Sequence, residues 1–293
     1  MSLTSLTHSL GRSRAFLVVG IVVSVLVPVL TLPRLPHVSP VPVLWGVAPW
    51  VVGKYVLCPL RWRVLTPDPH TRWWHLRAYA EGELLGLLTP GHVGSDVWRV
   101  HRLTRAGRGR GDAVLSVGTD RLVGALSLVG FVLFAGTSLP LSWALLSGGV
   151  TVLALGAALV VRRVRPELLP RRPLPSPRRL VQALVLSAGY QLTIAALLMG
   201  TLDATGHDLS ALAVLGAFGA SQVAGTVPGP NGASPRDGAL VAALMVCGIP
   251  WEAALAAVTV KAAVAWVPGL MLGGASLVLT RRALRRTPVP VPA

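Results

Sequence analysis

The chain has 293 residues, of which 53% are hydrophobic and only 13% are charged, and its mean hydropathy is +0.64. A soluble domain usually carries about 25% charged residues, so the composition excludes that class and indicates an integral membrane protein. The net charge of +16 does not indicate nucleic-acid binding, because the arginines fall in short segments between apolar runs. Cys58 and Cys247 form no CxxC pair and indicate neither a disulfide framework nor a metal site.

Several apolar runs approach the length of about 20 residues that a helix needs to cross a bilayer. The first, at residues 15–32, is followed by no small-residue cleavage site, so we expect an uncleaved span rather than a signal peptide. The sequence therefore predicts an all-α polytopic membrane protein with about six transmembrane helices. They are expected at residues 15–32, 41–57, 113–134, 142–161, 180–200 and 253–279.

Arginine is unevenly distributed among the segments that join these spans. The arginine-rich segments are residues 12–14, 61–77 (with Arg61, Arg63, Arg72 and Arg77), 99–110, 162–179 and 281–286. The intervening segments at residues 33–40, 135–141 and 201–208 hold one arginine in total. Because arginine and lysine collect on the cytoplasmic side, we expect a protein of the inner cell membrane with both termini in the cytoplasm.

Two further apolar stretches end in Pro-Gly breakers, which are Pro90-Gly91 and Pro228-Gly229. Cytoplasmic segments flank the first stretch on both sides, so this stretch enters the membrane and returns. The second follows an outside segment and precedes a span that runs inward, so it also returns. The sequence predicts two re-entrant helical hairpins, near residues 78–104 and 209–248. Irregular backbone at membrane depth is tolerated where it is buried in protein or lines a wet cavity.

The two hairpins resemble each other in sequence. Residues 89–96 read TPGHVGSD and residues 227–237 read VPGPNGASPRD, and the following helices align so that Arg121 lies opposite Lys261. The order span, span, hairpin, span therefore occurs twice with opposite orientation. Such inverted-topology repeats place the substrate site of transporters near the midplane. The expected organisation is a first repeat at 1–134, a second repeat at 135–279 with a basic linker at 162–179, and a cytoplasmic tail at 280–293.

The motifs resemble those of the flippase-like transmembrane domain found in lysylphosphatidylglycerol synthases and in stand-alone relatives. The resemblance covers residues 15–279 and rests on LLTPGHVGSDVWRVHRLTRAG, AVLSVGTDRLVGAL and VPGPNGASPRDGALVAALMVCGIPWEAALAAVTVKAAVAWVPGLMLGG. It implies a stand-alone member without the synthase domain. The residues that match the family elements are Pro90, Gly94, Asp96 and Arg99 (with Ser95 inserted), then Asp120 and Arg121, then Pro228, Gly229, Gly232 and Asp237, and finally Lys261.

The candidate substrate-binding residues are ionisable groups in the hairpins and the spans that follow them: Asp96, Arg99, Asp120, Arg121, Asp237 and Lys261. A charge inside a span is costly without a partner. Adjacent residues diverge by about 100° on a helix, so we expect Asp96 to pair with Arg121 and Asp237 with Lys261. Two readings stay open. The pairs join hairpin to span, or the cations bind a lipid phosphate.

Other residues also have two readings. The glycines beside the breakers, Gly91, Gly94, Gly229 and Gly232, either leave N–H groups free to attract an anion or permit a tight turn. Glu81 either pairs with Arg77, four residues earlier, or titrates with Glu83 in a wet cavity. His92 either contacts a headgroup or makes a local hydrogen bond.

The sequence favours a flippase-like or scramblase-like transporter that moves an anionic phospholipid or a polyprenyl-phosphate-linked lipid between leaflets. The alternative is a membrane glycosyl- or acyl-transferase on lipid-linked substrates, with Asp96, Asp120 or Asp237 as the base. A third reading is an accessory subunit for a partner enzyme of lipid or glycan synthesis. Nucleotide, metal and nucleophile motifs are absent from the sequence, so we expect no cofactor, no metal and no catalytic residue.

Overall fold

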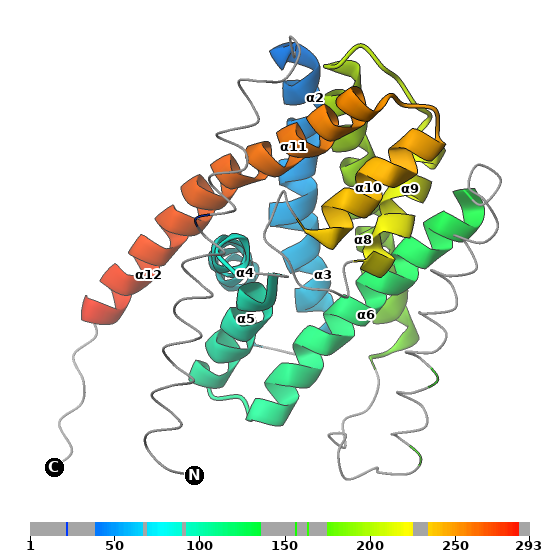
Figure 1. Cartoon of the computed structure of the whole chain (residues 1–293). Coiled ribbons are helices and arrows are strands. Elements are labelled where there is room, and N and C mark those ends of the chain that lie inside the picture. Colours follow the sequence, from blue (N-terminus) through cyan, green and yellow to red (C-terminus); the bar gives the residue numbers. More distant parts are fainter. Residues whose placement is uncertain are drawn as a thin grey trace, which may run out of the picture.

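The computed structural model of the chain describes residues 22, 39–66, 69–89, 92–135, 156, 163, 175–224 and 234–286. Within these residues the regular structure is helical (Figure 1). Helices long and apolar enough to cross a membrane lie at Pro40–Leu65, Arg110–Gly130, Pro177–Asp203 and Trp251–Arg282. The described part of the chain is therefore an all-helical, multi-pass membrane protein. The spans predicted at residues 15–32 and 142–161 lie outside the described residues, apart from Val22 and Gly156.

The first described span is one continuous helix made of α2 (Pro40–Val52), the π-helical η2 (Gly53–Leu57) and α3 (Cys58–Leu65). It is longer than the predicted span at 41–57, so Arg61 lies inside the helix and is only 5% exposed. The predicted end of this span at residue 57 is wrong, because the helix continues to Leu65. Arginine is tolerated here because Asp120 of another helix neutralises its charge.

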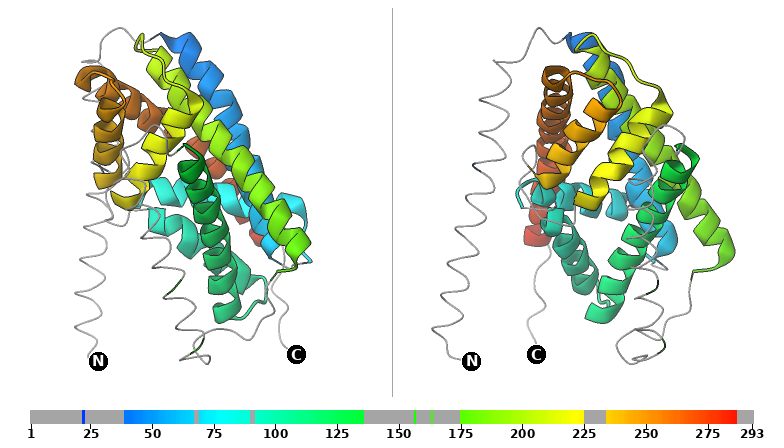
Figure 2. Two further views of the ribbon diagram at one scale, coloured as in Figure 1. Left: turned by 90° about the vertical axis from the view of Figure 1, so that its right-hand side faces the viewer. Right: turned by 45° about the vertical axis from the view of Figure 1, so that its right-hand side comes forward.

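Helix α8 (Pro177–Asp203) packs along α2 and α3 (Figures 1 and 2). Its 27 residues span about 40 Å, more than a hydrocarbon core. Two glycines allow the two backbones to approach closely, since a Cβ added at Gly200 would lie 3.1 Å from the Cα of Gly46. Small residues at such contacts are typical of helix packing in membranes.

Two pairs of shorter helices pack against each other at the positions of the predicted hairpins. The first pair is α4 (Arg72–Leu87) with α5 (Val93–Arg105), and the second is α9 (Ala211–Ala224) with α10 (Pro235–Val246). The turn from α5 to α6 lies at the bottom of Figure 1 and the turn from α10 to α11 at its top. The two pairs thus connect to the next helix at opposite ends of the molecule. The breakers Pro90, Gly91, Pro228, Gly229 and Gly232 lie outside the described residues.

The remaining helices complete the frame around these pairs. Helix α6 (Arg110–Ala135) follows the first pair, and α11 (Trp251–Pro268), η5 (Gly269–Gly273) and α12 (Gly274–Arg286) follow the second as one long element. This element continues past residue 279, where we expected the span to end. The largest apolar core cluster joins α2, α8, α9, α10 and α11. Large apolar side chains outside the core, such as Trp45 at 77% exposure, suit contact with lipid.

The glycine contact between α2 and α8 gives a stability prediction. Gly200→Ala should destabilise the protein by about 1–3 kcal/mol, because the new methyl group meets backbone atoms that cannot yield. Gly118→Ala is the matched control, since a Cβ there meets no described atom within 4 Å. The measurement is thermal unfolding of the two purified variants in one detergent. Equal midpoints would show that the glycine contact is not limiting.

The predicted orientation can be checked with single cysteines in a background that lacks Cys58 and Cys247. We expect His207→Cys, between α8 and α9, to react with a membrane-impermeant maleimide from outside the cell. Ser176→Cys, before α8, should react only after permeabilisation, because the arginine-rich side faces the cytoplasm. The opposite pattern would reverse the assigned topology.

Candidate functional site

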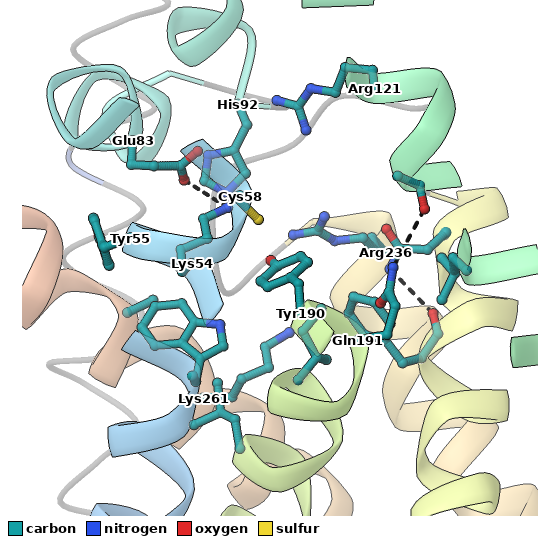
Figure 3. A pocket seen from close by; sticks show the side chains of 18 of the residues that line it. Lys54, Tyr55, Cys58, Glu83, His92, Arg121, Tyr190, Gln191, Arg236 and Lys261 are labelled. Carbon is teal, nitrogen blue, oxygen red and sulfur yellow. Dashed lines mark hydrogen bonds and ion pairs between the residues drawn. The ribbon is translucent and has the colours of Figure 1, made fainter. Parts of the chain in front are cut away.

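A cavity of about 630 Å³ lies between the two helix pairs and the spans. This is within the range of roughly 300–1,000 Å³ that is usual for small-molecule sites. The spans α2–η2–α3, α6, α8 and α11 all contribute to its wall, as do α4, α9 and α10. The ionisable and amide side chains that line it are Lys54, Tyr55, Cys58, Arg61, Tyr79, Glu83, His92, Arg121, Tyr190, Gln191, Gln222, Arg236 and Lys261, most of them labelled in Figure 3.

The wall of this cavity is strongly cationic. Its cationic side chains are Lys54, Arg61, Arg121, Arg236 and Lys261, whereas Glu83 is the acidic residue among the described lining residues. Low-dielectric walls strengthen the field of such a group of like charges. The cavity therefore attracts anions.

Both predicted ion pairs between hairpin and span are present. The Arg121 guanidinium (Nη2) lies 3.0 Å from Oδ1 of Asp96, and the Lys261 ammonium lies 3.1 Å from Oδ1 of Asp237. Arg121 and Lys261 line the cavity, whereas Asp96 and Asp237, also predicted to bind substrate, are not among its described lining residues. Arg121 and Lys261, which are aligned in the sequence, thus make the same kind of contact with an aspartate.

The first pair is the end of a longer series of alternating charges, which we call the charge chain: Arg61, Asp120, Arg99, Asp96 and Arg121. Asp120 accepts hydrogen bonds of 2.7 Å from Nε of Arg61 and from Nη1 of Arg99. Arg99 in turn donates to Asp96 at 2.6 Å. The side chains of Arg99 and Asp120 are 1% exposed, whereas Arg121 is 48% exposed. Arg99 and Asp120, predicted to bind substrate, are not among the described lining residues.

Lys54 and Glu83 form a second pair in the cavity wall, with the ammonium 2.8 Å from Oε2 of the carboxylate (Figure 3). Lys54 lies in the π-helical segment η2, and π-helical turns are frequent at functional sites. Ser95 also donates a hydrogen bond of 3.2 Å to Glu83. Burial favours the neutral acid, but the neighbouring ammonium outweighs it and holds the pKa of Glu83 at about 2. Glu83 is therefore a carboxylate.

Asp237 belongs to the N-terminal capping box of α10, where Ser234 accepts from its N–H and donates to its carboxylate. Burial opposes ionisation of this carboxyl, but Lys261 and Ser234 hold its pKa at about 2. The preceding residue, Arg236, lines the cavity. No carboxylate of the described residues lies within ion-pair distance of Arg236.

Glu81 and His92 make other contacts than the simplest ones expected from the sequence. Within the described residues Glu81 lies 3.4 Å from Nε of Arg102 and accepts hydrogen bonds from Trp98 and Ser276. Its partner is thus not Arg77, and it ties α4 to α12 away from the cavity. His92 lines the cavity with a left-handed backbone (φ 58°), and its Nδ1 is buried without a hydrogen-bond partner among the described residues.

Three lining cations were not predicted as site residues: Lys54, Arg61 and Arg236. Lys54 is the lone charged residue within the predicted span at 41–57. An intramembrane charge is by itself a signal of a functional site, so this one could have been found. Arg236 follows Pro235 in a stretch rich in proline and glycine. Nothing in its local pattern distinguishes it from an arginine in a solvent loop.

Comparison with known proteins gives one family. The family model described as lysylphosphatidylglycerol synthase TM region matches residues 15–273. This match confirms the resemblance drawn from the motifs. No curated protein and no solved structure matches the chain.

The charge chain gives a prediction about stability. Asp120→Asn should cost about 3–5 kcal/mol, because Arg61 and Arg99 would both remain buried without their shared carboxylate. Arg121→Gln should cost less than about 1 kcal/mol, since its half-exposed side chain leaves Asp96 paired with Arg99. Thermal unfolding in one detergent measures both variants. Similar losses of stability in the two variants would show that the buried end of the charge chain contributes no more than its exposed end.

Proposed function

Since the chain belongs to the family of lysylphosphatidylglycerol synthase transmembrane regions, we propose that it is a lipid transporter of the flippase or scramblase type. Its substrate is an anionic phospholipid or a polyprenyl-phosphate-linked lipid, which it moves between the leaflets of the inner cell membrane. The headgroup occupies the cationic cavity while the acyl or prenyl chains stay in the bilayer.

The observation that carries this proposal is the placement of Arg121 and Lys261 on the cavity wall, each held by an aspartate of the adjoining helix pair. A buried cation that served only as a structural staple would be expected inside the packing, as Arg99 is. Instead, both cations face a space large enough for a headgroup. Arginine binds phosphate through two parallel hydrogen bonds, and lysine acts as a point charge.

The helix pairs suit a role as re-entrant hairpins in an inverted-topology repeat. The helices α4, α5, α9 and α10 are shorter than the spans, and α4, α9 and α10 contribute residues to the cavity wall. In transporters built from inverted repeats, broken helices meet at a substrate site near the midplane. On this proposal the cavity lies at that level, with the arginine-rich ends of the helices in the cytoplasm.

The charge chain explains how a headgroup competes for Arg121. Asp96 accepts from both Arg99 and Arg121 through the same oxygen, Oδ1. When a phosphate takes over Arg121, Asp96 keeps Arg99 as its partner, so no carboxylate is left unpaired. The exchange replaces one charge-assisted contact by another, and the cost of releasing Arg121 stays small.

A transferase is less well supported, because the three carboxylates considered as its base are all engaged. Asp120 lies between Arg61 and Arg99, Asp96 contacts Arg99 and Arg121, and Asp237 is held by Lys261 and Ser234. A general base works best with a pKa near the operating pH, whereas the pKa of Asp237 is about 2. An accessory subunit would not transport lipid and would act only through a partner enzyme, so a transport assay on the purified protein separates the two proposals.

The double variant Arg121→Gln/Lys261→Gln tests the proposal in vesicles reconstituted with purified protein. Loss of two charged hydrogen-bond partners should slow transport of a fluorescent anionic lipid by about tenfold or more. Transport of a zwitterionic lipid with the same chains should change less. Lys261→Arg should keep its activity, because arginine retains the charge and adds a bidentate fork.

Arg281→Gln is the matched control, since it removes one exposed charge from the end of α12, away from the cavity. All variants must be compared at equal protein per vesicle, because a folding defect would imitate lost transport. Wild-type rates in the double variant would reduce Arg121 and Lys261 to structural residues and remove the basis for a phosphate site.

A further inference from the structure

The charges around the cavity do not balance. The cations that line it or belong to the charge chain are Lys54, Arg61, Arg99, Arg121, Arg236 and Lys261, and the carboxylates that pair with them are Glu83, Asp96, Asp120 and Asp237. Six cations therefore face four carboxylates among the described residues. The side chains of this region thus carry two positive charges in excess, and uncompensated charge in a membrane protein is unfavourable.

Each half of the molecule contributes one of these two excess charges. The charge chain has three cations and two carboxylates, and its excess lies at the exposed end, on Arg121. Lys54 and Glu83 balance each other. In the second half Asp237 pairs with Lys261, which leaves Arg236 in excess. Figure 3 shows the side chains of Arg121, from α6, and Arg236, from α10, both extending into the cavity.

Phosphate esters differ in the property that this arrangement can detect. A phosphomonoester carries a charge of about −1.5 to −2 near neutral pH and offers three acceptor oxygens. A phosphodiester carries a single negative charge and offers fewer free oxygens. Two guanidinium groups can each bind a phosphate through paired hydrogen bonds, so a monoester or a diphosphate satisfies both, whereas a diester leaves one positive charge uncompensated.

We propose that the cavity selects a headgroup with two negative charges, a terminal phosphomonoester or a diphosphate, over a phosphodiester, and that Arg236 together with Arg121 determines this preference. The inference rests on the proposed lipid transport and narrows its substrate class. Lys54 strengthens the preference for a dianionic headgroup. Its ammonium already pairs with Glu83, so this carboxylate is not available to bind a positively charged group of a lipid headgroup.

The test compares two lipids with identical acyl chains, phosphatidic acid as the monoester and phosphatidylglycerol as the diester. Binding to the purified full chain in detergent is measured by native mass spectrometry at neutral pH. Phosphatidic acid should bind about tenfold more tightly, as expected for an additional hydrogen-bonded charge. Arg236→Gln should abolish most of this preference, Arg236→Lys should retain much of it, and Arg178→Gln, an exposed control, should leave it unchanged.

Removal of Arg236 leaves no described carboxylate without its partner, so the variant is expected to fold, and its thermal midpoint verifies this. Equal affinity of the wild type for the two lipids, or a preference that survives Arg236→Gln, would overturn the inference. Transport of both lipids in vesicles would then still support the proposed function. Inorganic phosphate is the third probe. If inorganic phosphate binds as tightly as phosphatidic acid, the cavity recognises a dianion. The dianion would then not need to belong to a lipid, and the proposed lipid transport would be contradicted.

Discussion

The contact on which the rest of the arrangement depends is the Asp120 carboxylate between two buried guanidinium groups. Arg61 comes from α3, Arg99 from α5 and Asp120 from α6. A span, a short helix and a further span are thus joined at one point where water has little access. Because Asp120 neutralises one of these two positive charges and Asp96 the other, Arg99 can be buried in the packing. Asp96 also contacts Arg121, which lines the cavity.

Much of the fold could be predicted from the sequence, because membrane helices are marked by apolar length and positive loops. The spans at 180–200 and 253–279 and the two interrupted stretches correspond to α8, to α11–α12 and to the two helix pairs. The end of the first described span was misjudged at Arg61. Charge alone marks a boundary only if no partner neutralises it within the bilayer, and sequence does not show partners from distant helices.

The site residues were also predicted only in part. The similarity between the two Pro-Gly stretches, and between the helices that follow them, predicted the pairs Asp96–Arg121 and Asp237–Lys261, and both pairs are present. The buried roles of Arg61 and Arg99 could not be found in this way, because they have no counterpart in the second half. There Ser234, a neutral hydroxyl, supports the aspartate instead. The two ion pairs thus correspond in position, but Asp96 is supported by an arginine and Asp237 by a neutral serine.

The contact between Gly46 and Gly200 has a mechanical consequence. The two backbones meet here without intervening side chains, so α2 and α8 are closely packed along their contact. If the cavity opens alternately to the two sides of the membrane, the moving parts must lie elsewhere. The two helix pairs contact α6 and α11 through ion pairs at the cavity wall, and such ion pairs can exchange a partner for a ligand, although α5 is also held to α6 by the buried Arg99–Asp120 contact. In such a cycle the glycine contact would keep α2 and α8 together, whereas the ion pairs would allow other helices to change position.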